Sequence, residues 1–135
     1  MGDRVLVVVR QDKDDGVFIY SHWDGRSIPF DVQKALKANE KRWYEASFMT
    51  RVVIEEILKA HPGSVEEVRV SSWSDFDGEN HPVLELICGE EQIVRFCHHR
   101  YKPGTRQLVP MRGKWWSFVD FVRLPEKKLK AAWGD

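Results

Sequence analysis

The side chains best suited to binding chemistry lie between residues 95 and 119, where basic and aromatic residues are interleaved without any Asp or Glu. Arginine can hold a phosphate through two hydrogen bonds, and neighbouring aromatic rings can stack on a nucleobase. The preceding stretch, 66–94, is rich in acids and has Arg69 as its single Arg or Lys. Because clustered cations repel one another unless an anion offsets them, this segregation predicts a site for an anionic, nucleotide-like ligand. The ligand-binding residues expected from this basic stretch are Arg95, His99, Arg100, Tyr101, Lys102, Arg106, Arg112, Lys114 and Trp115.

The energies of such contacts are sufficient for a useful affinity. Each arginine–phosphate pair contributes on the order of 1.5–3 kcal/mol, and a stacked base adds about 1–3 kcal/mol. Two pairs and one stacked base sum to roughly 4–9 kcal/mol, and the upper end of this range corresponds to micromolar affinity or better before ordering costs are subtracted. The alternative is that the basic stretch faces the acidic 66–91 stretch of the same or a neighbouring subunit, which would favour a homo-oligomer. Since the formal net charge is zero, long nucleic acid is not an expected partner.

A second candidate group is the sequence YSHWDG at residues 20–25. On a strand, Tyr20 and His22 point to one face and Trp23 points to the other. Polar and aromatic groups at the end of a strand are typical of sites at a sheet edge, so Tyr20, His22 and Trp23 are expected to help bind the ligand. The alternative is structural: Asp24-Gly25 forms a tight turn, and the neighbouring rings pack beneath it.

This motif, followed by a short helix, the Arg42-Trp43 pair and a helix carrying Arg51, resembles a set of small bacteriophage and prophage proteins. In those proteins a YSHWGG-like hairpin strand precedes a helix, an RW pair and a second helix. The similarity covers about residues 5–60 and departs from the pattern at Asp24, where the family usually has Gly. The resemblance implies a phage accessory role, such as inhibition of host defence, and assigns no catalytic residue.

Two residue pairs could support catalysis: Cys97 with His99 as nucleophile and base, and His22 with Asp24 as acid–base partners. No nucleophile elbow, P-loop or dinucleotide fingerprint accompanies either pair. Enzymatic activity is therefore left uncertain and is not the preferred interpretation.

Metal binding is not expected. Cys97 and His99 could converge from one face of a strand, but zinc needs three or four ligands, and His61 and His81 stand alone in the sequence. No cofactor is expected either.

The length of 135 residues is suited to a single domain over residues 1–135. The apolar run at 5–9 is too short and too closely flanked by charges for a signal peptide, and no run approaches the roughly 18 apolar residues of a membrane helix. These features predict a protein of the cytoplasm, which the phage resemblance would place in a bacterial host cell. Cys88 and Cys97 lie in apolar runs typical of buried thiols, although a hairpin with both cysteines away from the turn would leave a disulfide open.

Strands are expected where β-branched residues form short apolar runs. Two pairs of such runs flank short Asp/Gly or Gly-Glu turns, and each pair predicts an antiparallel hairpin. Five consecutive apolar residues at 5–9 indicate a central strand that is buried on both faces. The stretch 100–114, with two Gly and two Pro, is expected to be an extended loop. The expected strands are 4–10, 17–22, 65–73, 83–88 and 91–98.

Helices are expected over 29–39, 42–60 and 126–132, and Ser117 with Asp120 forms the capping pattern of one more short helix. Paired hairpins with segregated helices predict an α+β fold. The expected architecture is an antiparallel sheet of about five strands (two hairpins plus one strand) with helices packed on one face.

The preferred functional hypothesis is a phage-type accessory protein that sequesters an anionic nucleotide-like ligand without turnover. One alternative is an inhibitor that docks on a host defence protein through Trp23, Trp73 and the charged faces. A second alternative is a small nucleotide-processing hydrolase.

Overall fold

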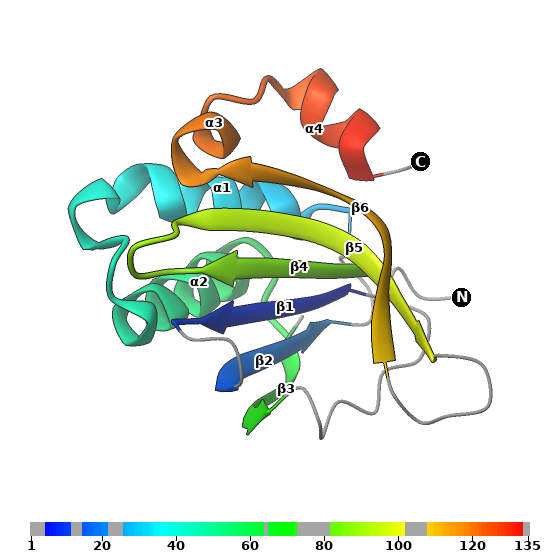
Figure 1. Cartoon of the computed structure of the whole chain (residues 1–135). Helices are drawn as coiled ribbons and strands as arrows, with labels where there is room; N and C mark the ends of the chain where they lie inside the picture. Colours follow the sequence, from blue (N-terminus) through cyan, green and yellow to red (C-terminus); the bar gives the residue numbers. More distant parts are fainter. Residues whose placement is uncertain are drawn as a thin grey trace.

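The chain forms one mixed six-stranded sheet with its helices on a single face (Figure 1). The computed structural model describes residues 5–11, 15–21, 26–63, 65–72, 82–101 and 108–133. The strands are β1 (Val5–Arg10), β2 (Asp15–Ser21), β3 (Val65–Ser72), β4 (Pro82–Ile87), β5 (Ile93–Tyr101) and β6 (Leu108–Ser117). The helices are α1 (Ile28–Ala38), the 3-10 turn η1 (Glu40–Arg42), α2 (Ala46–Ala60), α3 (Phe118–Val122) and α4 (Glu126–Trp133). The α+β class expected from the sequence is confirmed, with one strand more than predicted.

The central position of β1 follows from its sequence. All six residues of VLVVVR are buried, as expected for a continuous β-branched run with neighbours on both edges and cover on both faces. β1 pairs antiparallel with β2, which confirms the first hairpin, and parallel with β4 on its other side. The parallel pair departs from the expected all-antiparallel sheet. It arises because the chain leaves β3 at one edge and re-enters the sheet at its centre, giving the order β3-β2-β1-β4-β5-β6.

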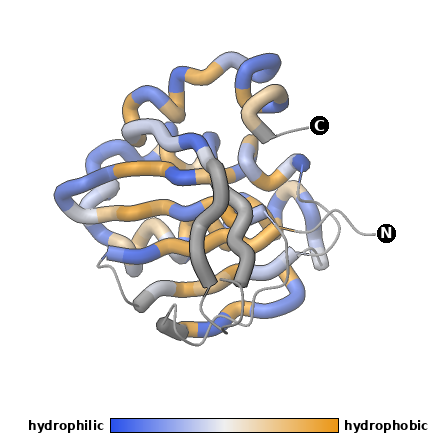
Figure 2. The backbone as a smooth tube through the Cα atoms, turned by 45° about the vertical axis from the view of Figure 1, so that its right-hand side comes forward, coloured by the Kyte–Doolittle hydropathy of each residue, from blue (hydrophilic) through white to orange (hydrophobic). Residues whose placement is uncertain are grey.

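Alternation along the strands divides the apolar residues between two faces. The main core lies between sheet and helices, and alternate β1 residues contribute to it together with residues of α1, α2, α3 and α4. We call the other side the helix-free face, because no described helix covers it (Figure 1). A smaller cluster of Leu6, Val8, Phe18 and Val83 lies there, with Tyr20 packed against it. Hydrophobic positions accordingly run through the middle strands of the sheet (Figure 2).

Three of the expected helices appear close to their predicted bounds. Pro29 lies in the first turn of α1, and Met49, Val53 and Ile57 form the buried stripe of α2. At the start of α3, the Asp120 N–H donates to Ser117 Oγ at 3.1 Å, which confirms the predicted cap. No described helix has the length and apolar character needed to cross a membrane.

Side chains from α1 and its following turn hold α3 against the helical layer. Gln33 Nε2 donates to the carbonyl oxygens of Phe121 and Leu124 at 3.0 and 2.9 Å, at the end of α3. The Trp43 ring meets Phe118 edge-on with centroids 5.4 Å apart. The carbonyls left open at the end of a short helix thus find partners, which fixes the chain direction after β6.

The prediction of a loop over 100–114 is wrong for the part that the structure describes, because Leu108–Ser117 is strand β6. Proline is tolerated there since β6 is an edge strand, and Pro110 lies opposite His99 of β5. A register irregularity between Cys97 and His99 bends the pair. Strand β4 begins at Pro82, opposite His98 of β5. Beyond this pair, β5 and β6 continue together to Tyr101↔Leu108 as a two-stranded extension that curves away from the sheet plane (Figure 1).

The two cysteines are not bridged. Cys88 is free and buried at the turn end of the β4–β5 hairpin, whereas Cys97 lies opposite Val83 near its other end. The sequence-based placement of both cysteines away from the turn was therefore wrong, because Cys88 directly precedes the turn at Gly89.

Candidate functional site

A row of directly opposed residues crosses the helix-free face with one member from each strand. Opposed residues on neighbouring strands point to the same side of a sheet, so the pairing register alone places these side chains in line. The row consists of Arg69, Phe18, Val8, Glu85, Arg95 and Trp115, from β3 to β6 in spatial order. Apolar side chains occupy its β2 and β1 positions, and charged and aromatic ones occupy β4, β5 and β6.

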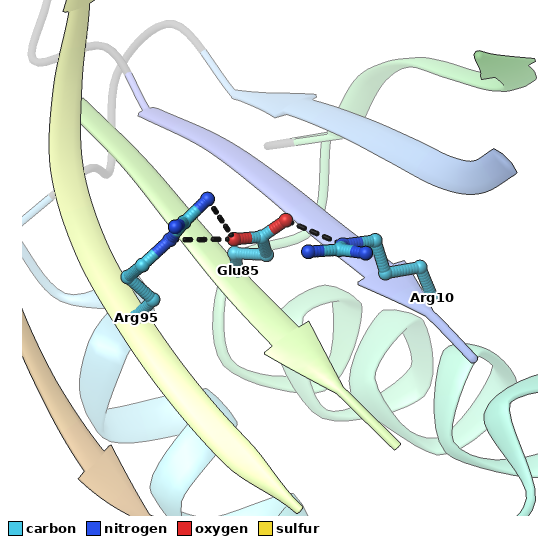
Figure 3. A network of polar contacts seen from close by, with 3 residues as sticks. All are labelled: Arg10, Glu85 and Arg95. Atoms are coloured by element: carbon cyan, nitrogen blue, oxygen red, sulfur yellow. Dashed lines mark hydrogen bonds and ion pairs between the residues drawn. The ribbon is translucent and has the colours of Figure 1, made fainter. Parts of the chain in front are cut away.

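Glu85 is the centre of an ion cluster on this face (Figure 3). Its Oε1 accepts hydrogen bonds from Arg95 Nε and Nη2 at 2.9 and 2.8 Å, and its Oε2 lies 2.5 Å from Arg10 Nε. The side chains of Glu85 and Arg10 are 1% and 8% exposed, whereas Arg95 is 37% exposed. Glu85 therefore serves two guanidinium groups at once, and Arg95 shares its carboxylate partner while keeping contact with solvent.

A glycine on β2 makes room for this cluster. A Cβ placed on Gly16 would lie 3.1 Å from Val8 Cγ1 and 3.2 Å from Arg10 Cβ, closer than packed side chains normally come. Glycine therefore lets the stem of Arg10 lie flat against the sheet, where its head group reaches Glu85 on the next strand.

The ring of Trp115 lies beside Arg95 and is largely open to solvent. The two residues are directly opposed on β6 and β5, and Trp115 is 68% exposed. Lys114 lies opposite Phe96, whose side chain belongs to the helix-side core, so Lys114 is on the other side of the sheet. The neighbouring Trp116 packs on Phe121 of α3 at 5.6 Å between centroids. The basic stretch is thus divided between two faces, and only part of it can meet one ligand.

The remaining predicted site residues have different outcomes. Tyr20 is half-buried on the helix-free face, opposite Leu6 and Glu67. The backbones of four others lie in the extension of β5 and β6, although their side chains are outside the described residues: His99, Arg100, Tyr101 and Arg112. Four predicted residues lie wholly outside the described ranges: His22, Trp23, Lys102 and Arg106. The same holds for Trp73 and for the proposed acid–base partner Asp24.

The pairing of Arg95 with Glu85 is an instance of the intramolecular alternative, in which the basic stretch faces the acidic one. It involves one described cation of the basic stretch and one acid of the preceding stretch. Sequence alone did not give this pair, because it depends on β4 and β5 placing residues 85 and 95 in register.

A cavity of about 470 Å³ lies outside the ends of β1 and β4. Sheets with parallel strands often bind ligands at this position, and the volume is within the range of small-molecule pockets. Arg10 lines it and so connects it to the ion cluster, while Gln11 Oε1 accepts a 3.3 Å hydrogen bond from the Ala46 N–H at the start of α2. Its lining residues are Arg10, Gln11, Ile87, Cys88, Gly89, Glu90 and Glu91. The sequence does not predict this cavity, because its position depends on the parallel pairing of β1 with β4.

Burial raises the pKa of the Cys88 thiol to about 12. The thiolate is the nucleophilic form of cysteine, so Cys88 is unreactive at neutral pH despite its place in the cavity wall.

A second pair of titratable groups lies in the helical layer. Asp31 Oδ2 of α1 is 3.2 Å from Nε2 of His61, which ends α2. Desolvation by burial raises the pKa of Asp31 to about 6; His61 and Lys34 oppose the shift, and Glu56 adds to it. The sequence carries one signal for this pair, since Asp31 occupies a position in the apolar stripe of α1. The sequence does not predict that His61 is its partner, because the two residues lie 30 positions apart along the chain.

Among the residues that the structure describes, no group of three or more His, Cys, Asp or Glu side chains is placed to hold a metal ion. No protein-family model, curated protein or solved structure matches the chain, so its site is assigned from its own geometry.

Proposed function

We propose that this protein binds a small anionic, base-containing ligand without turnover, on the helix-free face beside Arg95 and Trp115. One observation carries the proposal: a guanidinium that is 37% exposed and shares its carboxylate partner lies directly opposite an indole that is 68% exposed. A phosphate can accept hydrogen bonds from the outer N–H groups of Arg95 while a base stacks on Trp115.

The location of the charge supports this assignment. Glu85 fixes the Arg95 side chain through Nε and Nη2, so the arginine is held in place before the ligand arrives. Guanidinium has five N–H donors, and donors beyond those two are available on a half-exposed side chain. Pre-ordering of this kind lowers the entropy lost on binding.

Magnitudes show how many contacts the site needs. One charge-assisted bond of about 1.5–3 kcal/mol and one stacked base of about 1–3 kcal/mol sum to roughly 2.5–6 kcal/mol. Micromolar affinity corresponds to about 8 kcal/mol, so Arg95 and Trp115 require help from further cations. The sequence supplies Arg100 and Arg112 on the extension and Arg106 between its strands. The proposed ligand accordingly carries more than one phosphate.

Calorimetry with a panel of cyclic di- and trinucleotides tests the proposal. We expect one class of these compounds to bind the wild type, and Trp115→Ala to weaken that binding at least about ten-fold, the equivalent of about 1.4 kcal/mol. Tyr44→Ala is the matched control, because Tyr44 is a 55% exposed aromatic residue in the turn before α2. Equal binding by both variants would exclude Trp115 from the site.

The arginine is tested in the same way. Arg95→Gln should weaken binding, while Arg51→Gln on the exposed side of α2 should not. Recovery of chemically intact ligand after heat denaturation is expected for sequestration, and recovery of a hydrolysed product would instead establish turnover.

The biological setting that we propose is a phage-encoded accessory protein that removes a nucleotide signal of host defence. The support is the resemblance of residues 5–60 to small phage proteins, which stays a prediction from the sequence motif, together with the ligand chemistry above. Absence of binding across the whole nucleotide panel, with capture of a host defence protein instead, would favour the docking alternative.

A further inference from the structure

Strand β3 forms one edge of the sheet, and no described strand pairs with its outer side. Two of its apolar side chains point to the helix side and are exposed, Val68 by 47% and Val70 by 79%. Natural edge strands are usually protected from pairing by lysine, proline, a β-bulge or short length. Val65–Ser72 is eight residues long and contains neither lysine nor proline, and its register irregularity lies at Glu66, so residues 67–72 form the regular part of this edge. Its charges are of both signs, with Glu67 and Arg69 on the helix-free face opposite Tyr20 and Phe18.

We propose that β3 pairs with β3 of a second copy of this chain, antiparallel, about a two-fold axis at Val68. In an isologous interface of this kind, residues equally spaced on either side of the axis lie opposite one another. The Val68 register sets Glu67 opposite Arg69 of the second copy, and Arg69 opposite its Glu67. It also sets Val68 opposite Val68. Each copy therefore supplies the charges that the other requires.

The neighbouring registers lack this complementarity. A two-fold axis at Glu67 or at Arg69 brings like charges directly opposite each other, which destabilises paired strands. An axis at Val70 sets Arg69 opposite Ser71 and leaves Glu67 without Arg69 as its partner. The sequence VEEVRVSS therefore selects the Val68 register among the symmetric choices.

Within one copy, Glu67 and Arg69 form only a long, exposed ion pair. Arg69 Nε is 3.8 Å from Glu67 Oε1 along the same strand, and both side chains are exposed, by 40% and 58%. An exposed pair at this distance contributes little within one chain, so both charges remain available to a second copy. The dimer would join two six-stranded sheets edge to edge, and the Arg95–Trp115 sites would remain accessible because β6 is the opposite edge of each sheet.

Sedimentation equilibrium of two lysine variants tests both the pairing and its register. Val68→Lys places two lysines opposite each other on the axis and should raise the dimer dissociation constant at least about ten-fold. Val70→Lys, on the same face of the same strand, places each lysine two residues from the axis, beside the register irregularity at Glu66 of the second copy and not opposite another lysine, and should leave the dimer intact. A general apolar contact predicts the reverse order, because Val70 is the more exposed residue.

A charge exchange supplies a second test. Arg69→Glu should dissociate the dimer, and the double variant Glu67→Arg with Arg69→Glu should restore it, because the opposed pairs are then reversed but still complementary. Circular dichroism confirms that each variant is folded. A wild-type protein that remains monomeric up to about 100 µM, or an Arg69→Glu variant that dimerises as the wild type does, would overturn the proposal.

Discussion

Replacing the buried carboxylate at the centre of the ion cluster gives the most informative prediction about stability. Glu85→Gln keeps the size and shape of the side chain and removes its charge, so Arg10 and Arg95 lose the anion that both contact. Arg10 is 8% exposed and cannot regain full hydration, whereas Arg95 is 37% exposed and can turn toward water. The cost therefore falls mainly on the Arg10 side.

The magnitude follows from these exposures. Removing one partner of a buried ion pair destabilises a protein by about 3–5 kcal/mol, and the half-exposed Arg95 pair adds at most about 1 kcal/mol. The amide oxygen of glutamine still accepts one hydrogen bond, which restores about 1 kcal/mol. We expect a net loss of about 2–5 kcal/mol in the free energy of unfolding.

Urea denaturation followed by tryptophan fluorescence measures this loss. With an m-value of about 2 kcal/mol/M, the midpoint should fall by about 1–2.5 M relative to the wild type. Glu91→Gln, an exposed carboxylate in the β4–β5 turn, is the control and should change the free energy by less than about 0.5 kcal/mol. A Glu85→Gln midpoint equal to that of the control would refute the burial of Glu85 between two arginines.

A triple variant separates charge pairing from packing. Replacing Arg10 and Arg95 by Met and Glu85 by Leu removes all three charges together. When a buried ionic cluster is replaced as a whole by apolar residues, the free energy of unfolding is often unchanged or increased. This variant should therefore lose less stability than Glu85→Gln alone. A larger loss of stability than in Glu85→Gln would mean that the three side chains stabilise the fold by more than neutralising one another's charges.

Two further predictions concern other parts of the fold. Gly16→Ala should destabilise the protein by about 1–3 kcal/mol in the same urea assay, because the new Cβ would lie 3.2 Å from Arg10 Cβ; an unchanged midpoint would show that the strand has room to move. The pKa of Asp31 is raised to about 6, so between about pH 4 and 6 the folded state holds a proton that the unfolded state has lost, and stability should fall as the pH rises through this window. Asp31→Asn removes this contribution, so its thermal midpoint relative to the wild type should rise from pH 4 to 6. Asp120→Asn, at an exposed carboxylate, should show no such trend, and parallel curves for Asp31→Asn and the wild type would contradict the assignment.

Local sequence patterns were sufficient for most of the secondary structure. The β-branched run of β1 and the apolar stripe of α2 each determine a local conformation through short-range physics. The sequence does not predict β6, because Pro110 and Gly113 are typical of loops. A strand can contain this proline because β6 lies at the edge of the sheet.

The candidate site was predictable in its chemistry and only partly in its geometry. Arg95 and Trp115 were both selected as binding residues from composition, and the register sets them directly opposite each other. The partner of Arg95 was not predicted, because a contact between residues 85 and 95 requires knowledge of strand pairing. The assignment of Lys114 to the same group failed to distinguish the two faces of β6, since alternation could not be applied to a segment expected to be a loop.

A titration of ¹⁵N-labelled protein with the tightest-binding cyclic nucleotide tests the central claim most directly. The indole Nε1–H resonance of Trp115, assigned from its loss in Trp115→Phe, should shift in proportion to saturation. The resonance of Trp43, whose Nε1 donates to the Leu36 carbonyl at 2.8 Å in the core, should remain in place. Saturable binding that leaves the Trp115 resonance unchanged would contradict a ligand site beside Arg95.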